Sequence, residues 1–167
     1  MSATTLALTY ATSAHGAIDQ RRKYTDEPYI VHPIKVAGIV ERFGGTDDMI
    51  SAAYLHDVVE DTDVTISDIE DMFGIDVAVI VEGLTDISVP EDGNRSLRKA
   101  LDREHSAHAS YESQFVKLAD MIDNASDIGE RDPSFNAVYR KEMAALLKVL
   151  DKVKDDPIYT AAVKAVQ

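Results

Sequence analysis

The sequence contains no cysteine and no apolar run long enough to cross a membrane. The lack of thiols excludes disulfide bonds, thiolate catalysis and a cysteine site for structural zinc, and it favours a cytoplasmic protein. A membrane-spanning helix needs about 20 consecutive apolar residues, which no part of this chain provides. The chain also begins without the basic and hydrophobic stretches of a secretion signal. We therefore expect a cytoplasmic protein that has no membrane partner.

Basic residues are scarce as well. The 17 lysines and arginines face 30 aspartates and glutamates, so the formal net charge is −13. A negative field of this size repels nucleic acids and anionic membranes. It does not exclude a small anionic substrate, provided that a local cation offsets the repulsion. We therefore expect no nucleic acid partner, whereas a small phosphorylated molecule is compatible with the charge.

The chain has no internal repeat, no low-complexity tract and no linker of domain size. With 167 residues, 45% of them apolar, it suits one domain with a real core. A chain of this length buries about 70% of its unfolded surface. Apolar residues recur at helical spacing along most of the sequence. We predict an all-α single domain over residues 1–167, a bundle of about eight to ten helices with its motifs in residues 5–130 and C-terminal helices in residues 133–167.

The individual helices can be placed from periodicity and from capping residues. The segment 75–84 is apolar enough for a fully buried helix, with a strand as the alternative, and residues 90–93 are predicted to form a loop. The remaining predicted helices cover residues 4–20, 34–43, a segment capped by residues 46–48, 65–74, 95–107, 112–128, 135–153 and a short segment from Pro157.

The segment AAYLHDVVEDT, residues 52–62, ends an apolar run with a histidine and three carboxylates. On a continuous helix, His56 and Glu60 would be stacked four residues apart, as would Asp57 and Asp61. Carboxylates this close raise one another's pKa unless a cation lies among them. The alternative is a solvated helix end, but the apolar residues around the motif indicate a packed turn.

A second histidine stands in PYIVHP, residues 28–33. A residue that precedes proline is disfavoured in the α region, so His32 is predicted at a helix N-cap with Pro33 at the first helical position. This position would fix the direction of the imidazole and aim it as a metal ligand. Alone the motif is weak, because the histidine could simply cap the helix.

The third motif is FVKLADMIDN, residues 115–124. Asp120 and Asn124 share one helix face with Lys117, and the residues between them are apolar. A carboxylate in such surroundings needs a partner, because burying an unpaired charge is costly. For this segment alone, a structural ion pair between Lys117 and Asp120 is the simpler interpretation.

Together the three motifs supply two imidazoles and two carboxylates, those of His32, His56, Asp57 and Asp120. This mixture suits Mn²⁺, Fe²⁺, Co²⁺ or Zn²⁺ better than Ca²⁺, which prefers oxygen ligands alone. Four protein ligands in a larger coordination sphere leave room for water.

The order of RRK…PYIVHP, LHDVVEDT and VKLADMIDN resembles the HD-domain phosphohydrolases. More narrowly, it is similar to the hydrolase domain of RelA/SpoT-type enzymes and to the stand-alone small alarmone hydrolases of the metazoan SpoT homologue type. The resemblance extends over roughly residues 5–130. It implies a helical fold, one Mn²⁺ ion or another divalent transition metal, and removal of the 3′-pyrophosphate from guanosine tetra- or pentaphosphate, the alarmone of the stringent response.

The resemblance also implies roles for individual residues. The metal would be bound by His32, His56, Asp57 and Asp120. The attacking water would be oriented and deprotonated by Glu60 and Asp61. The nucleotide would be contacted by Arg22, Lys23, Lys117 and Asn124. The chain departs from the family pattern at residues 24–27, which lack the usual glycine, and at Met121, where many relatives have a basic residue.

Two alternatives stay open at this point. One is a phosphohydrolase of the same type that acts on another nucleotide, such as an adenine alarmone, NADPH or a deoxynucleoside triphosphate. The other is a non-catalytic nucleotide-binding module. Retention of both Glu60 and Asp61 argues against the second. The sequence does not determine self-association, so a homo-oligomer is compatible with it.

Overall fold

The computed structural model describes residues 1–167 and contains ten α-helices and no β-strand. This confirms the all-α prediction and agrees with the predicted number of helices. The helices are α1 Ala3–Ala17, α2 Val31–Arg42, α3 Asp47–Leu55, α4 Val58–Asp61, α5 Ile66–Phe73, α6 Ile75–Leu84, α7 Arg95–His108, α8 Tyr111–Arg131, α9 Pro133–Leu147 and α10 Pro157–Val166. Two short 3₁₀ helices complete the chain, η1 Pro90–Asp92 and η2 Asp151–Val153. None of these helices combines the length and the hydrophobicity that crossing a bilayer requires.

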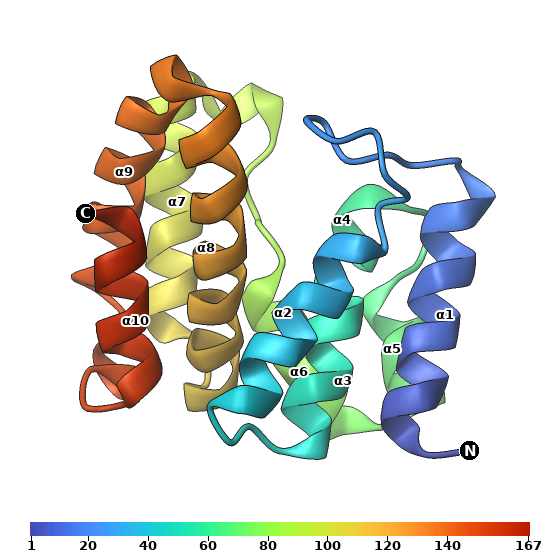
Figure 1. Ribbon diagram of the computed structural model, residues 1–167. Coiled ribbons are helices and arrows are strands. Elements are labelled where there is room, and N and C mark those ends of the chain that lie inside the picture. Colours follow the sequence, from blue (N-terminus) through green and yellow to red (C-terminus); the bar gives the residue numbers. More distant parts are fainter.

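The long helix α8 lies between the two halves of the molecule (Figure 1). It packs against α2, α3 and α6 on one side and against α9 and α10 on the other. Its apolar residues Val116, Leu118, Ala119 and Met121 are buried between these neighbours. The polar residues of α8 are therefore held at fixed positions beside α2 and α3.

One cluster of buried apolar side chains runs through the protein, but α7 contributes none of them. The buried residues of α7 are polar, Asp102 and Ser106. Asp102 accepts hydrogen bonds from the backbone N–H groups of Ile87 and Ser88 at 3.1 and 2.9 Å. The helix is thus attached mainly through polar contacts.

The junction of α3 and α4 differs from the prediction of one continuous helix. α3 ends at Leu55, and α4 begins at Val58 after a break at His56 and Asp57. The ring of His56 turns back to the end of α3, where its Nδ1 lies 2.7 Å from the backbone oxygen of Ala53. The predicted stacking of His56 and Glu60 on one helix is therefore wrong, because His56 lies in the break that precedes α4.

Three other helix predictions need correction. α2 begins at Val31, so His32 lies in its first turn rather than at the N-cap; Ile30 is already helical, with φ −54° and ψ −21°. Pro33 is tolerated there because N–H groups of the first turn have no helical partner. α6 is helical but not fully buried, since Ile75 and Val79 are exposed.

The third correction concerns α9, which ends at Leu147 and not at residue 153. The chain then turns, and Leu150 and Val153 reach the core separately through η2.

The contact between α6 and α8 depends on Gly83. A Cβ atom at this position would lie 2.5 Å from Oγ of Ser113 and 3.0 Å from Cβ of Ala109. Glycine therefore lets α6 approach the start of α8 closely. This close packing positions the segment after α6 beside α4. There the backbone N–H of Asp86 donates a hydrogen bond to Glu60.

Candidate metal-centred active site

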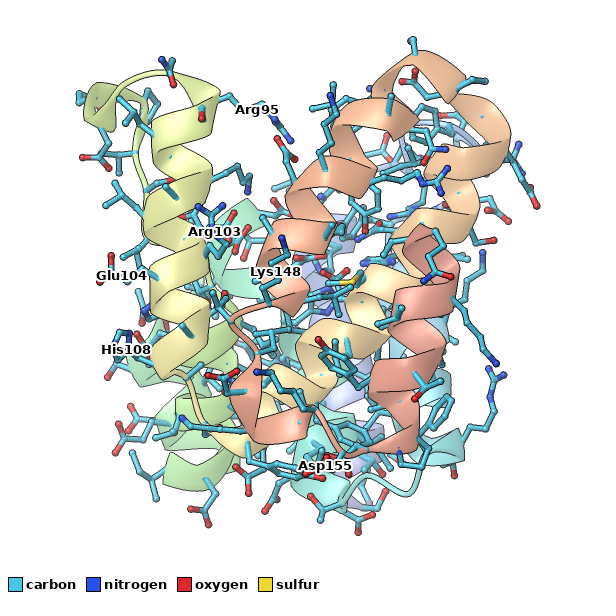
Figure 2. The ribbon with its side chains drawn as sticks, turned by 90° about the vertical axis from the view of Figure 1, so that its left-hand side faces the viewer. Arg95, Arg103, Glu104, His108, Lys148 and Asp155 are labelled. Atoms are coloured by element: carbon cyan, nitrogen blue, oxygen red, sulfur yellow. The ribbon has the colours of Figure 1, made fainter.

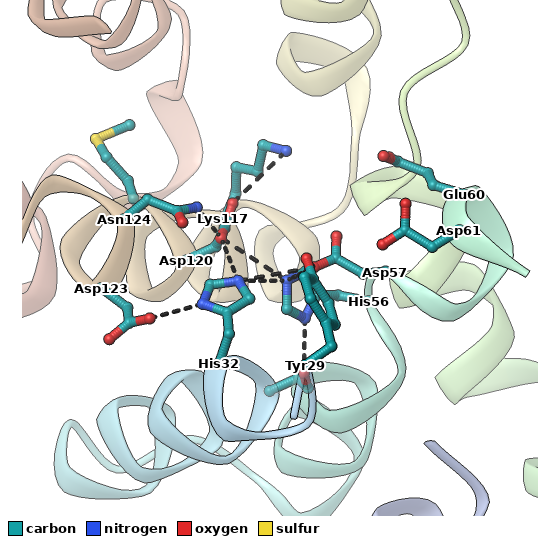
Figure 3. Close-up of polar contacts among 12 residues, drawn as sticks. Tyr29, His32, His56, Asp57, Glu60, Asp61, Lys117, Asp120, Asp123 and Asn124 are labelled. Carbon is teal, nitrogen blue, oxygen red and sulfur yellow. Dashed lines mark hydrogen bonds and ion pairs between the residues drawn. The ribbon is translucent and has the colours of Figure 1, made fainter. Parts of the chain in front are cut away.

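Two histidines and two aspartates that are distant in the sequence meet at one point of the fold (Figure 3). His32 comes from α2, His56 and Asp57 form the junction of α3 and α4, and Asp120 lies in the middle of α8. Both imidazoles are buried. The two carboxylates are partly exposed and line a cavity. The structure thus brings together the four residues that the sequence singled out as metal ligands.

The distances among the four side chains suit a shared cation. The Nε2 atoms of His32 and His56 lie 3.2 Å apart. Oδ1 of Asp120 is 3.1 Å from Nε2 of His32 and 3.7 Å from Nε2 of His56. Oδ2 of Asp57 is 3.7 and 3.0 Å from the same two atoms. Two ligands about 2.1 Å from one cation lie about 3.0 Å apart at a right angle and about 3.4 Å apart at the tetrahedral angle.

Outer hydrogen bonds orient both imidazole rings. Nδ1 of His56 lies 2.7 Å from the oxygen of Ala53, and because a carbonyl only accepts, this nitrogen carries the hydrogen. Nδ1 of His32 donates in the same way to Oδ2 of Asp123 at 2.6 Å. When the rings are neutral, this tautomer leaves the lone pairs on the two Nε2 atoms, which both face the same point. Such outer partners are typical of metal-binding histidines.

The charges at the site call for a positive partner. Burial opposes a charge on His56, but Asp57 and Asp120 outweigh this effect and raise the pKa of His56 well above its ordinary value. Burial alone would raise the pKa of Asp120, yet the neighbouring imidazoles of His32 and His56 hold this pKa well below its ordinary value. The carboxylates stay ionised and attract either protons or a cation. The donor set therefore fits a divalent cation.

Asp123 connects the metal-ligand cluster to a buried ion pair. Besides accepting the hydrogen of His32, its Oδ2 lies 3.9 Å from Nη2 of Arg22. The guanidinium of Arg22 in turn binds Asp127 at 2.5 Å. Both aspartates belong to α8, one helical turn apart. α8 therefore contacts both ring nitrogens of His32, Nδ1 through Asp123 and Nε2 through Asp120.

Replacing Asp123 with asparagine should weaken Mn²⁺ binding by about 10- to 100-fold, as is usual for outer partners of metal-bound histidines. The variant keeps the size of the side chain but loses the charge that makes Nε2 of His32 a stronger ligand. Titration calorimetry with Mn²⁺ measures the affinity. Asp155→Asn, at an exposed position outside the cavity lining, is the matched control. Equal affinities in the two variants would refute this role.

Glu60 and Asp61 extend from α4 toward the metal-ligand cluster (Figure 3). Oε1 of Glu60 accepts a hydrogen bond from the backbone N–H of Asp86 at 2.5 Å. Burial raises the pKa of Glu60 to about 7, and the charge of Asp86 adds to this rise. Burial also raises the pKa of Asp61, although a hydrogen bond from Gln20 opposes the change. Both carboxylates are thus stronger proton acceptors than ordinary ones.

Lys117, Asp120 and Asn124 lie on one face of α8, as the helical spacing predicted. Nδ2 of Asn124 donates to Oδ1 of Asp120 at 2.6 Å, and Nζ of Lys117 lies 4.0 Å from Oδ2. Burial opposes the charge of Lys117, but Asp120 and Asp86 more than offset it and raise the pKa of the lysine. Lys117 is therefore a cation in the lining of the cavity.

The two basic residues predicted to contact the substrate lie in different surroundings. Arg22 is mostly buried in its ion pair with Asp127 and is not part of the cavity lining. This geometry favours support of the metal-ligand cluster over substrate binding for Arg22. Nζ of Lys23 is exposed and lies 5.9 Å from the ring centre of Phe135, which lines the cavity. Lys23 thus stands near the rim.

A cavity of about 330 Å³ lies beside the metal-ligand cluster. Sites for small molecules usually have about 300–1,000 Å³. One group of lining residues is cationic and comes mostly from α7: Arg95, Lys99, Arg103 and Lys117. Another group is apolar or aromatic and comes from α8 and α9: Met121, Ile128, Phe135, Tyr139, Met143 and Leu146.

Arg95 connects the two walls. Figure 2 shows Arg95 and Arg103 on the side of α7 that faces α9, whereas Glu104 and His108 point away. Nε and Nη2 of Arg95 bind the carboxylate of Glu142 on α9 at 2.7 and 2.9 Å. Its guanidinium also lies 5.2 Å from the ring centre of Phe135.

Sequence reasoning missed the supporting contacts of the site. Neither Asp123 nor Tyr29 received a role from the sequence. The hydroxyl of Tyr29 donates to Oδ2 of Asp57 at 2.6 Å. Helical spacing offered a signal for Asp123, which follows Asp120 by three residues on the same helix.

The family model described as HD domain matches residues 7–152 of the chain. A guanosine-3′,5′-bis(diphosphate) 3′-pyrophosphohydrolase of Danio rerio is 43% identical over 119 residues, which are 69% of this chain and 64% of that protein. A protein of Synechocystis sp. named as a probable enzyme of the same type is 52% identical over 69 residues, 41% of this chain and 9% of that protein. The chain thus spans less than two thirds of the length of either relative.

A solved structure described as a metazoan orthologue of SpoT that hydrolyses ppGpp has a similar fold. The TM-score is 0.80 at 30% sequence identity, and the alignment covers 99% of this chain and 94% of the other.

Proposed function

Because this chain belongs to the HD-domain family, we propose that it is a metal-dependent phosphohydrolase, a guanosine-3′,5′-bis(diphosphate) 3′-pyrophosphohydrolase. The names of its relatives and the similarity to the SpoT orthologue support this substrate. The observation that carries the proposal is the convergence of His32, His56, Asp57 and Asp120 at the wall of a cavity of suitable size.

The four ligands would hold Mn²⁺, a cation that accepts mixed nitrogen and oxygen ligands. When bound, such a cation supplies Lewis acidity to the phosphoryl group and to the water that attacks it. Outside the metal-ligand cluster, Asp123 and the backbone of Ala53 keep the two imidazoles in the required tautomer.

Glu60 is the proposed general base. Its carboxylate lines the cavity and has a pKa of about 7, so it accepts a proton readily at neutral pH. Asp61 would orient the same water from the neighbouring position on α4. Attack at the phosphorus attached to the 3′ oxygen breaks the phosphorus–oxygen bond, which releases pyrophosphate and leaves a 3′ hydroxyl.

The two walls of the cavity suit the two parts of a nucleotide. The cations of α7 and Lys117 would neutralise phosphate groups in a protein of negative net charge. The apolar wall with Phe135 and Tyr139 would contact the base and ribose. Asn124 and Lys23 would contact the nucleotide as well. Their positions support this, since Asn124 lies beside Asp120 and Lys23 lies near the rim of the cavity.

The rate should depend on pH through Glu60. A general base must be ionised, and its ionised fraction grows as pH rises through its pKa. We therefore expect kcat to rise with pH and to level off only above the pKa of Glu60, which burial and the charge of Asp86 raise to about 7. A bound cation favours the ionised carboxylate of Glu60, so it moves the acid limb of the kcat profile, the part in which kcat rises with pH, to lower pH.

Asp86→Asn removes the like charge and should shift the acid limb of the kcat profile to lower pH. Asp76→Asn, at an exposed position on α6, is the control and should leave the limb in place. A limb that stays in place in Asp86→Asn would show that Glu60 does not govern the profile.

A panel of nucleotides incubated with Mn²⁺ tests the proposed function. Release of pyrophosphate from guanosine tetra- or pentaphosphate supports it. Turnover only of an adenine alarmone, NADPH or a deoxynucleoside triphosphate would replace the substrate but keep the reaction class. Tight binding without any turnover would indicate a nucleotide-binding module instead.

We further infer that the protein acts in the cytoplasm, on the alarmone of the stringent response. The lack of cysteine and the soluble nucleotide substrate support this location. The net charge of −13 supports a protein without nucleic acid or anionic membrane partners.

A further inference from the structure

A buried histidine in the last turn of α1 is connected to the site without belonging to the metal-ligand cluster. His15 is only 1% exposed, and its Nδ1 lies 2.7 Å from Oε1 of Gln20. Nε2 of Gln20 donates to Oδ2 of Asp61 at 2.8 Å. A chain of hydrogen bonds therefore connects His15 on α1 to Asp61 on α4.

The direction of each of these hydrogen bonds is fixed. An ionised carboxylate only accepts, so Gln20 must turn its amide nitrogen toward Asp61. The amide oxygen of Gln20 then faces His15, whose Nδ1 must carry the hydrogen. His15 thereby excludes the flipped amide, in which the oxygen of Gln20 would face the carboxylate.

Packing alone does not explain a histidine at position 15. Its Nε2 is buried and has no hydrogen-bond partner. An unpaired buried polar atom lowers stability, and an apolar ring would fill the same space without this cost. The ring lies 4.8 Å from that of Tyr29, a contact that phenylalanine would also make. What phenylalanine lacks is the Nδ1 hydrogen that Gln20 receives.

A neutral donor suits the chemistry of Asp61. No lysine or arginine forms an ion pair with this carboxylate, although several others at the site are paired. A neighbouring cation would lower its pKa strongly, whereas a neutral amide fixes the carboxylate in space and leaves it a better proton acceptor.

We propose that His15 is a positioning residue for hydrolysis: it holds the amide of Gln20, which holds Asp61 toward the attacking water. This inference rests on the proposed function, in which Asp61 orients that water. It adds α1, which contributes no metal ligand, to the parts of the fold on which the rate depends.

His15→Phe is expected to lower kcat by about 10- to 100-fold, the size of effect that a small misplacement of a reacting group produces. KM and Mn²⁺ affinity should stay within about twofold, and the melting temperature should change little, because removal of the unpaired nitrogen offsets loss of the hydrogen bond to Gln20. His15→Asn, whose amide nitrogen can take the place of Nδ1, should restore most of kcat. A residue with a merely structural role would instead lose stability and rate together.

His108→Phe is the matched control. This histidine also lies in the last turn of a helix, and its Nδ1 contacts a backbone oxygen of its own helix, that of Glu104, at 2.9 Å. It points away from α9 and does not line the cavity. Its substitution should leave kcat unchanged.

A double-mutant cycle isolates the path through Asp61. In an Asp61→Asn background, His15→Phe should cause no further loss of kcat, because the group that it positions is already gone. The proposal is overturned if His15→Phe lowers kcat by the same factor in the Asp61→Asn background, or if His15→Phe alone leaves kcat unchanged. Neither result affects the proposed function, which depends on turnover by the wild type.

Nuclear magnetic resonance of the ¹⁵N-labelled protein gives a readout that needs no turnover. The side-chain amide signals of Gln20 should shift in His15→Phe and stay near the wild-type positions in His15→Asn. Unchanged signals in His15→Phe overturn the proposal. If the wild type hydrolyses no nucleotide of the panel, the proposed function is refuted instead. A shift of the Gln20 signals would then say nothing about catalysis.

Discussion

Asp57→Ala is expected to abolish stable cation binding and to lower kcat by about a thousandfold or more, which corresponds to about 4 kcal/mol of activation free energy. Oδ2 of Asp57 lies 3.0 Å from Nε2 of His56 and also accepts the hydroxyl hydrogen of Tyr29. Removing the carboxylate leaves two imidazoles and a single aspartate to hold the metal. His56→Ala should have the same result, because it removes a ligand from the same junction of α3 and α4.

Metal content after dialysis, measured by mass spectrometry, and kcat at saturating substrate test this prediction together. Asp63→Ala is the control, since Asp63 follows α4 at an exposed position. An Asp57→Ala protein that turns over substrate without bound metal would eliminate the metal-centred mechanism.

Glu60→Gln is expected to retain the metal and to lower kcat by about 100- to 10,000-fold, the usual contribution of a general base. Glutamine still accepts the hydrogen bond from the backbone of Asp86, so the loop after α6 should keep its place. It cannot accept the proton of the attacking water, and the acid limb of the pH profile should disappear.

The measurements for Glu60→Gln are kcat across pH and metal content. Glu70→Gln, exposed on α5, provides the control for loss of a surface charge. Full activity with intact metal content would assign the proton transfer to another group. Loss of the metal would mean that Glu60 belongs to the ligand set.

Helical periodicity carried most of the fold prediction, because each element can be recognised from its own apolar spacing. The break between α3 and α4 could not be found in this way. His56 and Asp57 both have helical backbone angles, with φ of −58° and −99°. What separates the helices is the turn of the His56 ring back to Ala53, a contact that competes with continuation of the helix.

The site was predictable where its residues share one helix and not where they meet across the fold. Lys117, Asp120 and Asn124 are spaced along α8, so their common face follows from sequence alone. The partner of Arg22 is Asp127, 105 residues later in the chain. No local pattern shows that this ion pair holds the guanidinium away from the cavity.

The backbone at residues 24–27 is a related case. The chain lacks the glycine that the family pattern suggests there, and Asp26 adopts a left-handed conformation with φ of 58°. Aspartate tolerates this region better than most residues, because its short side chain bonds locally. The turn is therefore kept without glycine, and the backbone N–H of Arg22 still donates to the oxygen of Glu27 at 2.9 Å.

Because α7 is attached through polar contacts, most of its residues can change the selectivity of the cavity without changing the stability of the fold. Since this helix adds no apolar side chain to the common core, amino-acid changes along it, apart from those at the buried residues Asp102 and Ser106, should have little effect on the free energy of unfolding. Under the proposed function, the same changes would alter which phosphorylated molecules the neighbouring cavity accepts, since Arg95, Lys99 and Arg103 all lie on this one helix and line the cavity. Descendants of such a protein can thus exchange one ligand for another by evolving a single helix, while the catalytic centre opposite stays as it is.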